Sequence, residues 1–377
     1  MKSRASVMIK AATREAPGRY ETVDVVLDEP RQNEILVRLV ASGLCHSDDH
    51  VATGDAQAAR YPIIGGHEGA GVVEKVGPST PGFEPGDHVV FSFVAACGRC
   101  RWCASGMQNL CDAGAVIMLG SRPDDPSSFR AHLTDGTDVA QLCGIGTFSQ
   151  YTVANVLSAV KVDKDLPLDK LCLLGCGVGT GWGSAVNAAK AGPGQTVIVM
   201  GIGGIGINAV QGAALAGASN VIAVDPVAFK RESALKLGAT HAFASIEEAD
   251  AFAKTKTNGQ GADSAIVTVG VVKPEHVGQA FAAIRKAGTV VVTGVGSMYD
   301  DTIPVSLSEL TFFQKRIQGA LFGQMNPSWD IIMQTEMYRD GKLLLDELVT
   351  STYTLDQVAQ GYEDMHAGKN IRGVVLF

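Results

Sequence analysis

The chain has 377 residues, of which 46% are hydrophobic and 19% are charged, and its net charge of -8 comes from 31 basic and 39 acidic residues. This composition is typical of a globular protein of about two or three domains, and it excludes disorder as the main state. No basic stripe is visible, so we expect no nucleic-acid partner. The N-terminus lacks a signal-peptide core, and no apolar run approaches the roughly 18 residues that cross a bilayer, so we expect no membrane partner and a cytoplasmic location.

The first part of the chain is typical of a β-rich domain with many turns. Apolar and polar residues alternate over 23–41, as in antiparallel strands, and residues 65–77 are rich in glycine and valine. Four cysteines follow with the spacing Cys97-x2-Cys100-x2-Cys103-x7-Cys111. Because four thiolates so close together can close a tetrahedral site with no open position, we predict a structural zinc that folds a lobe at 95–113.

The stretch Gly43–His50 gathers several side chains that can do chemistry. It offers a thiolate, a hydroxyl, two carboxylates and two imidazoles, namely Cys45, Ser47, Asp48, Asp49, His46 and His50. Two glycine-rich turns each present one further possible metal ligand, His67 and Cys176. Spacing cannot assign residues so far apart in the sequence to one metal site. A lone His67 can be a structural histidine, and Cys176 can be a buried thiol. Cys172 is a rival ligand that periodicity does not exclude.

From about residue 168 the pattern changes to strands that alternate with helices, which predicts βαβ units and a parallel sheet. The expected strands are 197–200, 221–224, 264–269 and 289–293. The expected helices are 184–190, a helix through about 216, 231–237 and 276–286. Two helices at 331–341 and 355–367 and a strand at 373–377 complete the chain, and we expect this last segment to fold back onto the first domain.

A dinucleotide site is predicted where strand 197–200 runs into a glycine-rich turn and a helix follows. The turn contains the glycines Gly201, Gly203, Gly204 and Gly206. They allow a tight turn and close approach of the backbone to a pyrophosphate, which the helix N-terminus then faces. Asp225 ends the next strand, where a carboxylate binds ribose hydroxyls and repels a 2′-phosphate, so NAD is favoured over NADP. Lys230 lies near the expected ribose and could bind it, or it could be a solvated lysine on a helix. The glycine turn itself could instead be a structural turn without a ligand.

Along nearly its entire length the sequence resembles the zinc-dependent, medium-chain alcohol dehydrogenases. The matching pieces are Gly43–His50, Gly66–Gly71, the four-cysteine lobe, Gly175–Gly183, the glycine turn and Ile371–Gly373. The resemblance implies an α/β protein with a GroES-like β-rich catalytic domain and a Rossmann domain with a doubly wound parallel sheet. We expect the catalytic domain at 1–177, the Rossmann domain at 178–321 and the return of the chain to the catalytic domain at 322–377.

The resemblance also assigns the metal ligands. It implies that Cys45, His67 and Cys176 bind a catalytic zinc with an exchangeable fourth position, whereas Cys172 is a core residue. Each chain would then hold two zinc ions, one catalytic and one structural. Asp48 would hold the second nitrogen of His67, and Glu68 would be a near neighbour that can approach the metal.

The implied reaction is oxidation of an alcohol by hydride transfer to NAD. Zinc stabilises the alkoxide, and the proton leaves through Ser47, a ribose hydroxyl of the cofactor and His50, which opens to solvent. Ser47 could instead be a turn-capping hydroxyl and His50 a surface histidine. The resemblance places His46, Arg372 and Val295 at the cofactor, with His46 replacing an arginine that faces the pyrophosphate in many relatives. The alternative for Arg372 is a surface arginine.

Three aromatic residues, Phe93, Phe148 and Trp182, fall where family members place substrate-pocket residues, although each could equally be a core residue. Segment 112–143 resembles the extra loop of the dimeric members, which borders the cleft. These members pair through the strand near Val291–Val295, so the resemblance predicts a homodimer, with a tetramer as the alternative.

Two runs, Ala96–Cys111 and Ala209–Gly212, resemble the nicotinoprotein alcohol dehydrogenases. These keep NAD bound through turnover and pass electrons to a dye such as nitroso-dimethylaniline, or to mycofactocin. The expected function is oxidation of primary alcohols, or the reverse reduction of aldehydes. One alternative is a thiol-dependent formaldehyde dehydrogenase, for which we find no cationic cluster that would bind the carboxylate of a thiol adduct. A more remote alternative is a non-catalytic NAD-binding protein, although all three zinc ligands are present.

Overall fold

The computed structural model describes residues 1–297 and 300–377, and the chain divides into two compact units. Unit 1 contains Met1–Cys176 together with Asn326–Phe377, and unit 2 contains Gly177–Met325. The borders expected from the sequence are 177/178 and 321/322. The C-terminal segment therefore belongs to the same unit as the N-terminal part of the chain.

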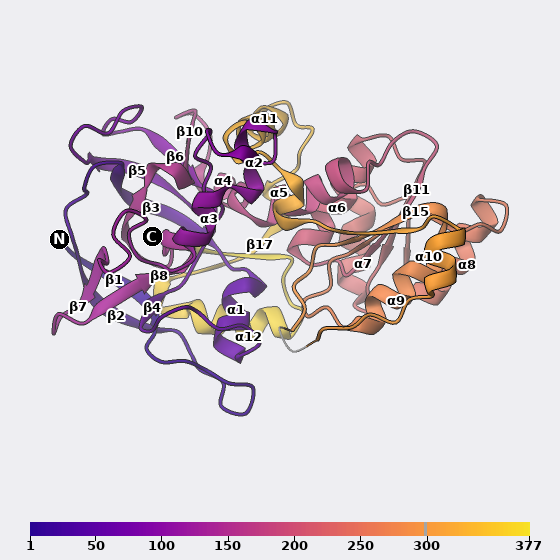
Figure 1. The fold of residues 1–377 in the computed structure, drawn as a ribbon, viewed down its shortest axis with the longest axis horizontal. Helices are drawn as coiled ribbons and strands as arrows, with labels where there is room; N and C mark the ends of the chain where they lie inside the picture. The colour runs from indigo at the N-terminus through magenta and orange to yellow at the C-terminus, as the bar shows by residue number, and fades with distance from the viewer. Residues whose placement is uncertain (298–299) are drawn as a thin grey trace. The chain divides into compact units, whose positions relative to one another are not determined.

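Unit 1 is built from a closed barrel and a seven-stranded sheet (Figure 1). The barrel has the order β1-β2-β7-β8-β4, formed by β1 (Lys2–Met8), β2 (Glu21–Leu27), β4 (Ile63–Ile64), β7 (Ala131–Leu133) and β8 (Asp138–Gln141). The sheet has the order β10-β6-β5-β3-β18-β17, with β9 also paired to β3. Its strands are β3 (Glu34–Gly43), β5 (Gly69–Val76), β6 (His88–Phe91), β9 (Tyr151–Asn155), β10 (Ala159–Val162), β17 (Val349–Tyr353) and β18 (Arg372–Leu376).

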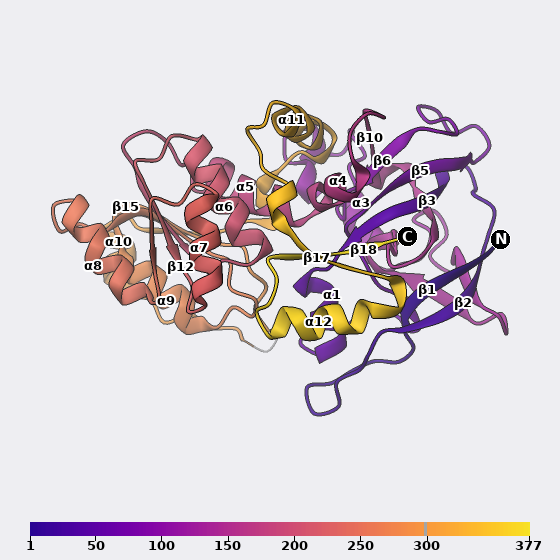
Figure 2. The ribbon, with the colours of Figure 1, turned by 180° about the vertical axis from the view of Figure 1, so that it is seen from behind.

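Strand β3 is central to the sheet of unit 1, and the C-terminal strand joins it. β3 pairs antiparallel with β5, β9 and β18, and in this register Ser42 lies opposite Gly69 and Gly43 lies opposite Val374. Figure 2 shows the yellow strands β17 and β18 among the indigo and purple strands of the N-terminal part. The last residues of β3 therefore lie beside the first residues of β5 and β18, at one end of these neighbouring strands.

Unit 2 is a six-stranded parallel sheet with the order β13-β12-β11-β14-β15-β16 (Figure 1). Its strands are β11 (Thr196–Met200), β12 (Asn220–Val224), β13 (His241–Phe243), β14 (Ala262–Val267), β15 (Ile284–Val292) and β16 (Arg316–Gly319). The helices of this unit are α5 (Gly177–Gly183), α6 (Gly204–Leu215), α7 (Ala228–Lys236), α8 (Ile246–Lys256), α9 (Pro274–Ala283) and α10 (Leu307–Phe312). Parallel neighbours need crossover connections, which the helices supply. The predicted fold class, a β-rich domain plus a Rossmann domain, is confirmed.

The glycine-rich run Gly177–Gly183 forms helix α5, although the sequence predicts a helix only from residue 184 onward. Residues Ser184–Ala188 continue it as a π-helical turn. Glycine disfavours helix formation, but here it permits close packing. A Cβ at Gly181 would lie 2.0 Å from the carbonyl oxygen of Ile205 in α6. Packing of α5 against α6 therefore overrides the low helix propensity of the run.

The remaining helices lie in unit 1. They are α1 (His46–Thr53), α2 (Arg101–Ala104), α3 (Asp112–Ile117), α4 (Leu168–Leu171), α11 (Pro327–Arg339) and α12 (Val358–His366). Single 3-10 turns occur in both units at Gln108–Leu110, Leu142–Gly144, Val156–Ser158, Cys172–Gly175, Leu321–Gln324, Asp346–Leu348 and Leu355–Gln357. Within residues 1–297 and 300–377, no helix is both long and apolar enough to cross a bilayer.

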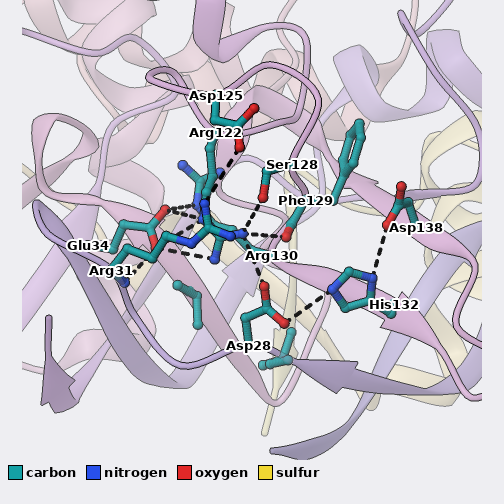
Figure 3. Close-up of polar contacts among 12 residues, drawn as sticks. Asp28, Arg31, Glu34, Arg122, Asp125, Ser128, Phe129, Arg130, His132 and Asp138 are labelled. Atoms are coloured by element: carbon teal, nitrogen blue, oxygen red, sulfur yellow. Dashed lines mark hydrogen bonds and ion pairs between the residues drawn. The ribbon is translucent and has the colours of Figure 1, made fainter.

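A buried ion cluster anchors segment 112–143 to the first strands of unit 1 (Figure 3). Glu34, the first residue of β3, is 2% exposed, and its Oε1 lies 2.6 Å from Arg130 Nε and 3.1 Å from Arg122 Nε. Arg122 also pairs with Asp28 at 3.1 Å. The segment contains α3, β7 and β8 and places two arginines in the core.

Candidate active site

The ends of β3 and β5 bring Cys45 and His67 together. β3 ends at Gly43, and Cys45 follows as the N-cap of α1. β5 begins at Gly69, two residues after His67. The two segments are joined where the Gly43 N–H donates to the carbonyl oxygen of Glu68 at 2.9 Å. Sheet register therefore positions these two ligands.

Cys176 reaches the same place through the 3-10 turn that precedes it. Gly175 packs against the end of β6, where a Cβ would lie 2.1 Å from the carbonyl oxygen of Phe91, so a side chain cannot be accommodated. Cys172, the rival ligand, is fully buried, and its Sγ donates to the carbonyl oxygen of Asp169 at 3.5 Å. Burial raises the pKa of the Cys172 thiol, which disfavours the thiolate that a metal needs.

Four buried ligand atoms, from Cys45, His67, Glu68 and Cys176, lie within 4.8 Å of one another. Atoms that bind the same zinc at about 2.0–2.3 Å must lie within roughly this distance of one another. His67 Nε2 is buried without a hydrogen-bond partner, as expected of an atom that binds a metal. Burial would lower the pKa of His67, but Asp48 and both thiols raise it well above its usual value. The surroundings of the His67 ring therefore favour a positive charge. The donor set therefore fits a zinc ion.

Asp48 holds the imidazole of His67 and the turn that carries it. Its Oδ2 lies 2.9 Å from His67 Nδ1, and its Oδ1 accepts the N–H of Gly66 at 2.7 Å. The Tyr20 hydroxyl donates to the carbonyl oxygen of Asp48 at 3.0 Å. This is the usual carboxylate support of a metal-binding histidine. Sequence reasoning missed Tyr20, because no motif surrounds it.

Phe148 is a core residue in the structure, which favours the alternative considered for it. The side chain is fully buried and packs edge-to-face on Tyr20, with ring centroids 5.8 Å apart. Its N–H donates to the carbonyl oxygen of Gly65, and a Cβ at Gly66 would lie 2.5 Å from the Phe148 nitrogen. Phe148 therefore supports the turn that carries His67.

The other two predicted pocket residues are partly exposed. The Phe93 ring lies edge-to-face to the His67 ring, with centroids 5.7 Å apart, so it borders the metal ligands. Trp182 is the last but one residue of α5 in unit 2. Their contact with substrate stays a prediction.

Arg372 is not a surface residue, which excludes the alternative considered for it. It is 3% exposed, pairs with the Glu68 carboxylate, and donates to the carbonyl oxygen of Leu44 at 3.2 Å. Burial raises the pKa of Glu68 to about 7, although Arg372 opposes this shift. A contact of Arg372 with the cofactor stays a prediction.

Helix α1 carries the residues of the expected proton relay. Ser47 is exposed, with its Oγ 3.8 Å from Cys45 Sγ. His50 is only 4% exposed, so little of its side chain is open to solvent, and its role in the relay stays a prediction. Its Nδ1 instead faces Asp55 Oδ2 at 3.8 Å. His46 is partly buried, and burial lowers its pKa despite the neighbouring Cys45 thiol, so at neutral pH it carries little of the positive charge of an arginine.

The four-cysteine lobe has the geometry of a closed zinc site. The sulfurs of Cys97 and Cys103 lie 4.0 Å apart, and those of Cys100 and Cys111 lie 3.9 Å apart. A tetrahedral zinc with Zn–S bonds of about 2.3 Å requires sulfur separations of about 3.8 Å. Backbone N–H groups of Cys97, Cys100 and Cys103 donate to thiol sulfurs within the set. These donors stabilise thiolates, so the lobe fits a structural zinc.

The glycine turn of unit 2 has the form of a dinucleotide cradle. Gly201 has a φ of +90°, and a Cβ at Gly206 would lie 1.9 Å from the Gly201 carbonyl oxygen. Gly203, the N-cap of α6, faces open space, so its backbone is accessible to a phosphate at the helix N-terminus. Asp225 is buried, and its carboxylate accepts the N–H of Ile202 at 2.8 Å, which fixes the turn.

The other predicted cofactor residues of unit 2 are Gly204 of the glycine turn, Lys230 and Val295. Gly204 begins α6, and Lys230 lies half-buried in α7. Val295 follows β15 and is 51% exposed. The contacts of Lys230 and Val295 with a dinucleotide stay predictions.

Known proteins match this chain along its length. The sequence profile of the alcohol dehydrogenase GroES-like domain matches residues 31–164, and that of the zinc-binding dehydrogenase matches residues 204–335. Over 376 residues the chain is 51% identical to putative alcohol dehydrogenase D of Mycobacterium tuberculosis, covering 100% of both chains. Over 368 residues it is 52% identical to the NDMA-dependent alcohol dehydrogenase of Amycolatopsis methanolica, covering 97% of this chain and 98% of the relative. The solved structure of an alcohol dehydrogenase zinc-binding domain protein from Burkholderia ambifaria is 31% identical, with a TM-score of 0.91, and the match covers 100% of this chain and 99% of that one.

Proposed function

Because this chain belongs to the zinc-dependent alcohol dehydrogenase family, we propose that it oxidises primary alcohols with an NAD that it retains through turnover. It is a zinc-dependent, NAD-linked dehydrogenase. The observation that carries the chemistry is the convergence of Cys45, His67 and Cys176 within 4.8 Å. Retention of NAD is supported by the 52% identity to the NDMA-dependent relative.

The side chains of unit 1 have distinct roles in the proposed reaction. Cys45, His67 and Cys176 would hold a zinc ion, which would supply a Lewis acid that lowers the pKa of an alcohol, and a bound NAD would supply the hydride acceptor. Asp48 fixes the tautomer and orientation of His67, so that Nε2 is the ligand nitrogen. Ser47, exposed beside Cys45, takes the proton of the alcohol at its hydroxyl and passes it toward His50.

The cellular setting follows from the proposed chemistry. All eight cysteines are free, and two sets of them are arranged to bind metal, which suits a reducing compartment such as the cytoplasm. If NAD does not leave, an external acceptor must reoxidise it, and a dye such as NDMA, or mycofactocin, is the acceptor class we propose. A non-catalytic role is disfavoured because the convergent ligands would then have no use.

Retention of NAD predicts that the purified protein carries about one NAD per chain. After gel filtration, heating should release NAD in near-stoichiometric amount, detectable by chromatography and absorbance. The same protein should oxidise primary alcohols with NDMA when no NAD is added, and a thiol such as glutathione should not be required for aldehydes. Absence of released NAD, together with activity only on added NAD, would leave an ordinary exchanging dehydrogenase.

We infer that the protein forms a homodimer through β16 and α10. The expected pairing strand near Val291–Val295 is not a free edge, because β15 is paired by β14 on one side and β16 on the other. β16 is the edge of the sheet, and the preceding α10 exposes Leu307 (76%) and Phe312 (79%). An unpaired edge beside exposed apolar side chains is a typical pairing surface.

Replacing Phe312 by aspartate is expected to shift the protein from dimer to monomer in sedimentation velocity. A charge at the centre of an apolar contact remains unpaired and opposes association. Trp329→Asp is the matched control, because Trp329 is 67% exposed but lies in unit 1, and it should remain dimeric. A dimeric Phe312→Asp variant would contradict the assignment of this surface, and a wild-type monomer would contradict the dimer itself.

A further inference from the structure

The expected relay ends at a histidine that has almost no access to water. His50 exposes 4% of its surface. The chain folds back on α1 directly after the helix, where the Ala56 N–H donates to the carbonyl oxygen of His50 at 3.0 Å. A proton delivered to this imidazole therefore needs a second group through which it can reach solvent.

Asp55 is placed to be that group. Its Oδ2 lies 3.8 Å from His50 Nδ1, and its side chain is 17% exposed, whereas the His50 side chain is 5% exposed. At 3.8 Å the two atoms are too far apart for a direct hydrogen bond, so a water molecule at the protein surface would carry a proton between them.

The position of Asp55 is built into the fold. Arg14 Nε donates to Asp55 Oδ1 at 2.7 Å, and the Thr53 hydroxyl donates to Oδ2 at 3.0 Å. Gly54, at φ +80°, ends α1, and a Cβ there would lie 2.4 Å from the carbonyl carbon of Thr13. Only glycine allows the turn that carries Arg14 to pack on the end of the helix, so the carboxylate is held before any substrate binds.

We propose that Asp55 is the positioning residue of His50 and the outlet of its proton to solvent. This inference depends on the proposed function. A carboxylate beside Nδ1 favours the tautomer protonated there, which leaves Nε2 as the basic nitrogen. When an N–H bond forms at Nε2, the N–H bond at Nδ1 breaks and its proton passes to water at Asp55, with no change in electron count. The arrangement follows the general logic by which a carboxylate orients a histidine base.

The groups that face the pair are consistent with an ionised Asp55. Burial would raise the pKa of Asp55, but the hydrogen bonds from Arg14 and Thr53 lower it, so the carboxylate remains charged at neutral pH. On the same helix, the His46 ring lies 6.3 Å from the His50 ring. Asp55 is therefore the charged group in contact with His50 Nδ1, and Arg14 lies behind it.

The test replaces Asp55 by asparagine, which keeps the shape of the side chain and removes its charge. In ¹⁵N nuclear magnetic resonance spectra of the histidines, the preference of His50 for the tautomer protonated at Nδ1 should be lost, because the carboxylate that favours this tautomer is gone. The plateau of kcat should fall by about tenfold, less than the loss of a whole general base. Added imidazole buffer should restore it, and Asp55→Glu should restore the charge effect.

Asp356→Asn is the matched control, because Asp356 is also paired with an arginine, Arg4, at 2.7 Å, and lies outside the relay. It should leave the tautomer of His50 and the value of kcat unchanged. A wild-type tautomer preference of His50 in the Asp55→Asn variant would overturn the inference. A wild-type protein that oxidises no alcohol would overturn the proposed function instead, and the spectra would still decide whether Asp55 controls His50.

Discussion

Replacing Cys45 by serine is expected to abolish alcohol oxidation and to lower the zinc content from two ions per chain to one. A serine hydroxyl is not ionised near neutral pH, so the buried site would lose one of its thiolates while His67 and Cys176 remain. A Lewis acid of this kind contributes several kcal/mol to the reaction, so kcat should fall by at least about 10³-fold. Metal analysis by mass spectrometry and a substrate panel with NDMA measure the two effects.

The matched control is Cys172→Ala. Cys172 is the nearest cysteine in sequence to Cys176, but it is fully buried, and its Sγ is hydrogen-bonded to the carbonyl oxygen of Asp169. Its loss should therefore leave two zinc ions and near-normal activity. Circular dichroism should show an unchanged fold for both variants, because the four-cysteine lobe keeps its own ion. Full activity with two zinc ions in Cys45→Ser would refute the ligand assignment. Loss of one zinc in Cys172→Ala would favour the rival ligand.

Replacing Glu34 by alanine is expected to lower the free energy of unfolding by about 3–5 kcal/mol, the usual cost of breaking a buried ion pair. The carboxylate faces Arg122 and Arg130, which are 0% and 1% exposed (Figure 3). Removal of the Glu34 carboxylate leaves Arg130 without this ion pair, and Asp28 remains as a carboxylate partner of Arg122. Urea unfolding followed by circular dichroism measures the change, and the catalytic zinc ligands are untouched.

The effect of Glu34 should depend on pH with a definite sign. Burial alone would raise the pKa of Glu34, but Arg130, the Arg31 N–H and Arg122 outweigh it and lower the pKa. A lowered pKa stabilises the folded state above the unfolded pKa of about 4.3, and this stabilisation is lost as the pH falls through the folded value. The difference between wild type and Glu34→Ala should therefore be full near pH 7 and should shrink in acid.

Glu29→Ala is the control for this cluster. Glu29 pairs with Lys75 at 2.6 Å, but its side chain is 71% exposed, so its loss should leave the unfolding midpoint unchanged. If Glu34→Ala unfolds at the same urea concentration as wild type, the two arginines must find other partners, and the cluster would not anchor segment 112–143.

Local spacing determined a large part of this protein. The glycine turn at Gly201–Gly206, the strand before it and the helix after it follow from backbone sterics, so the dinucleotide cradle could be predicted from its own residues. The four-cysteine lobe is equally local, because its ligands come from one short segment. The parallel sheet of unit 2 followed from alternating periodicities. The helix α5 did not, since its seven residues include four glycines, and the packing that requires Gly181 and Gly183 is visible only against α6 and Gly323.

The reactive centre depends on segments that are distant in the chain. The residues alone left Cys172 as a rival to Cys176. The structure packs Gly175 on β6 and brings Cys176 to Cys45 and His67. The resemblance named the same ligands, but it placed Phe148 at a pocket where the structure has a core residue. The physical reason is common to these cases. Backbone geometry fixes motifs within one turn. The register and packing of strands decide which side chains converge, which are buried and which strands have free edges, and a single stretch of sequence does not contain this information.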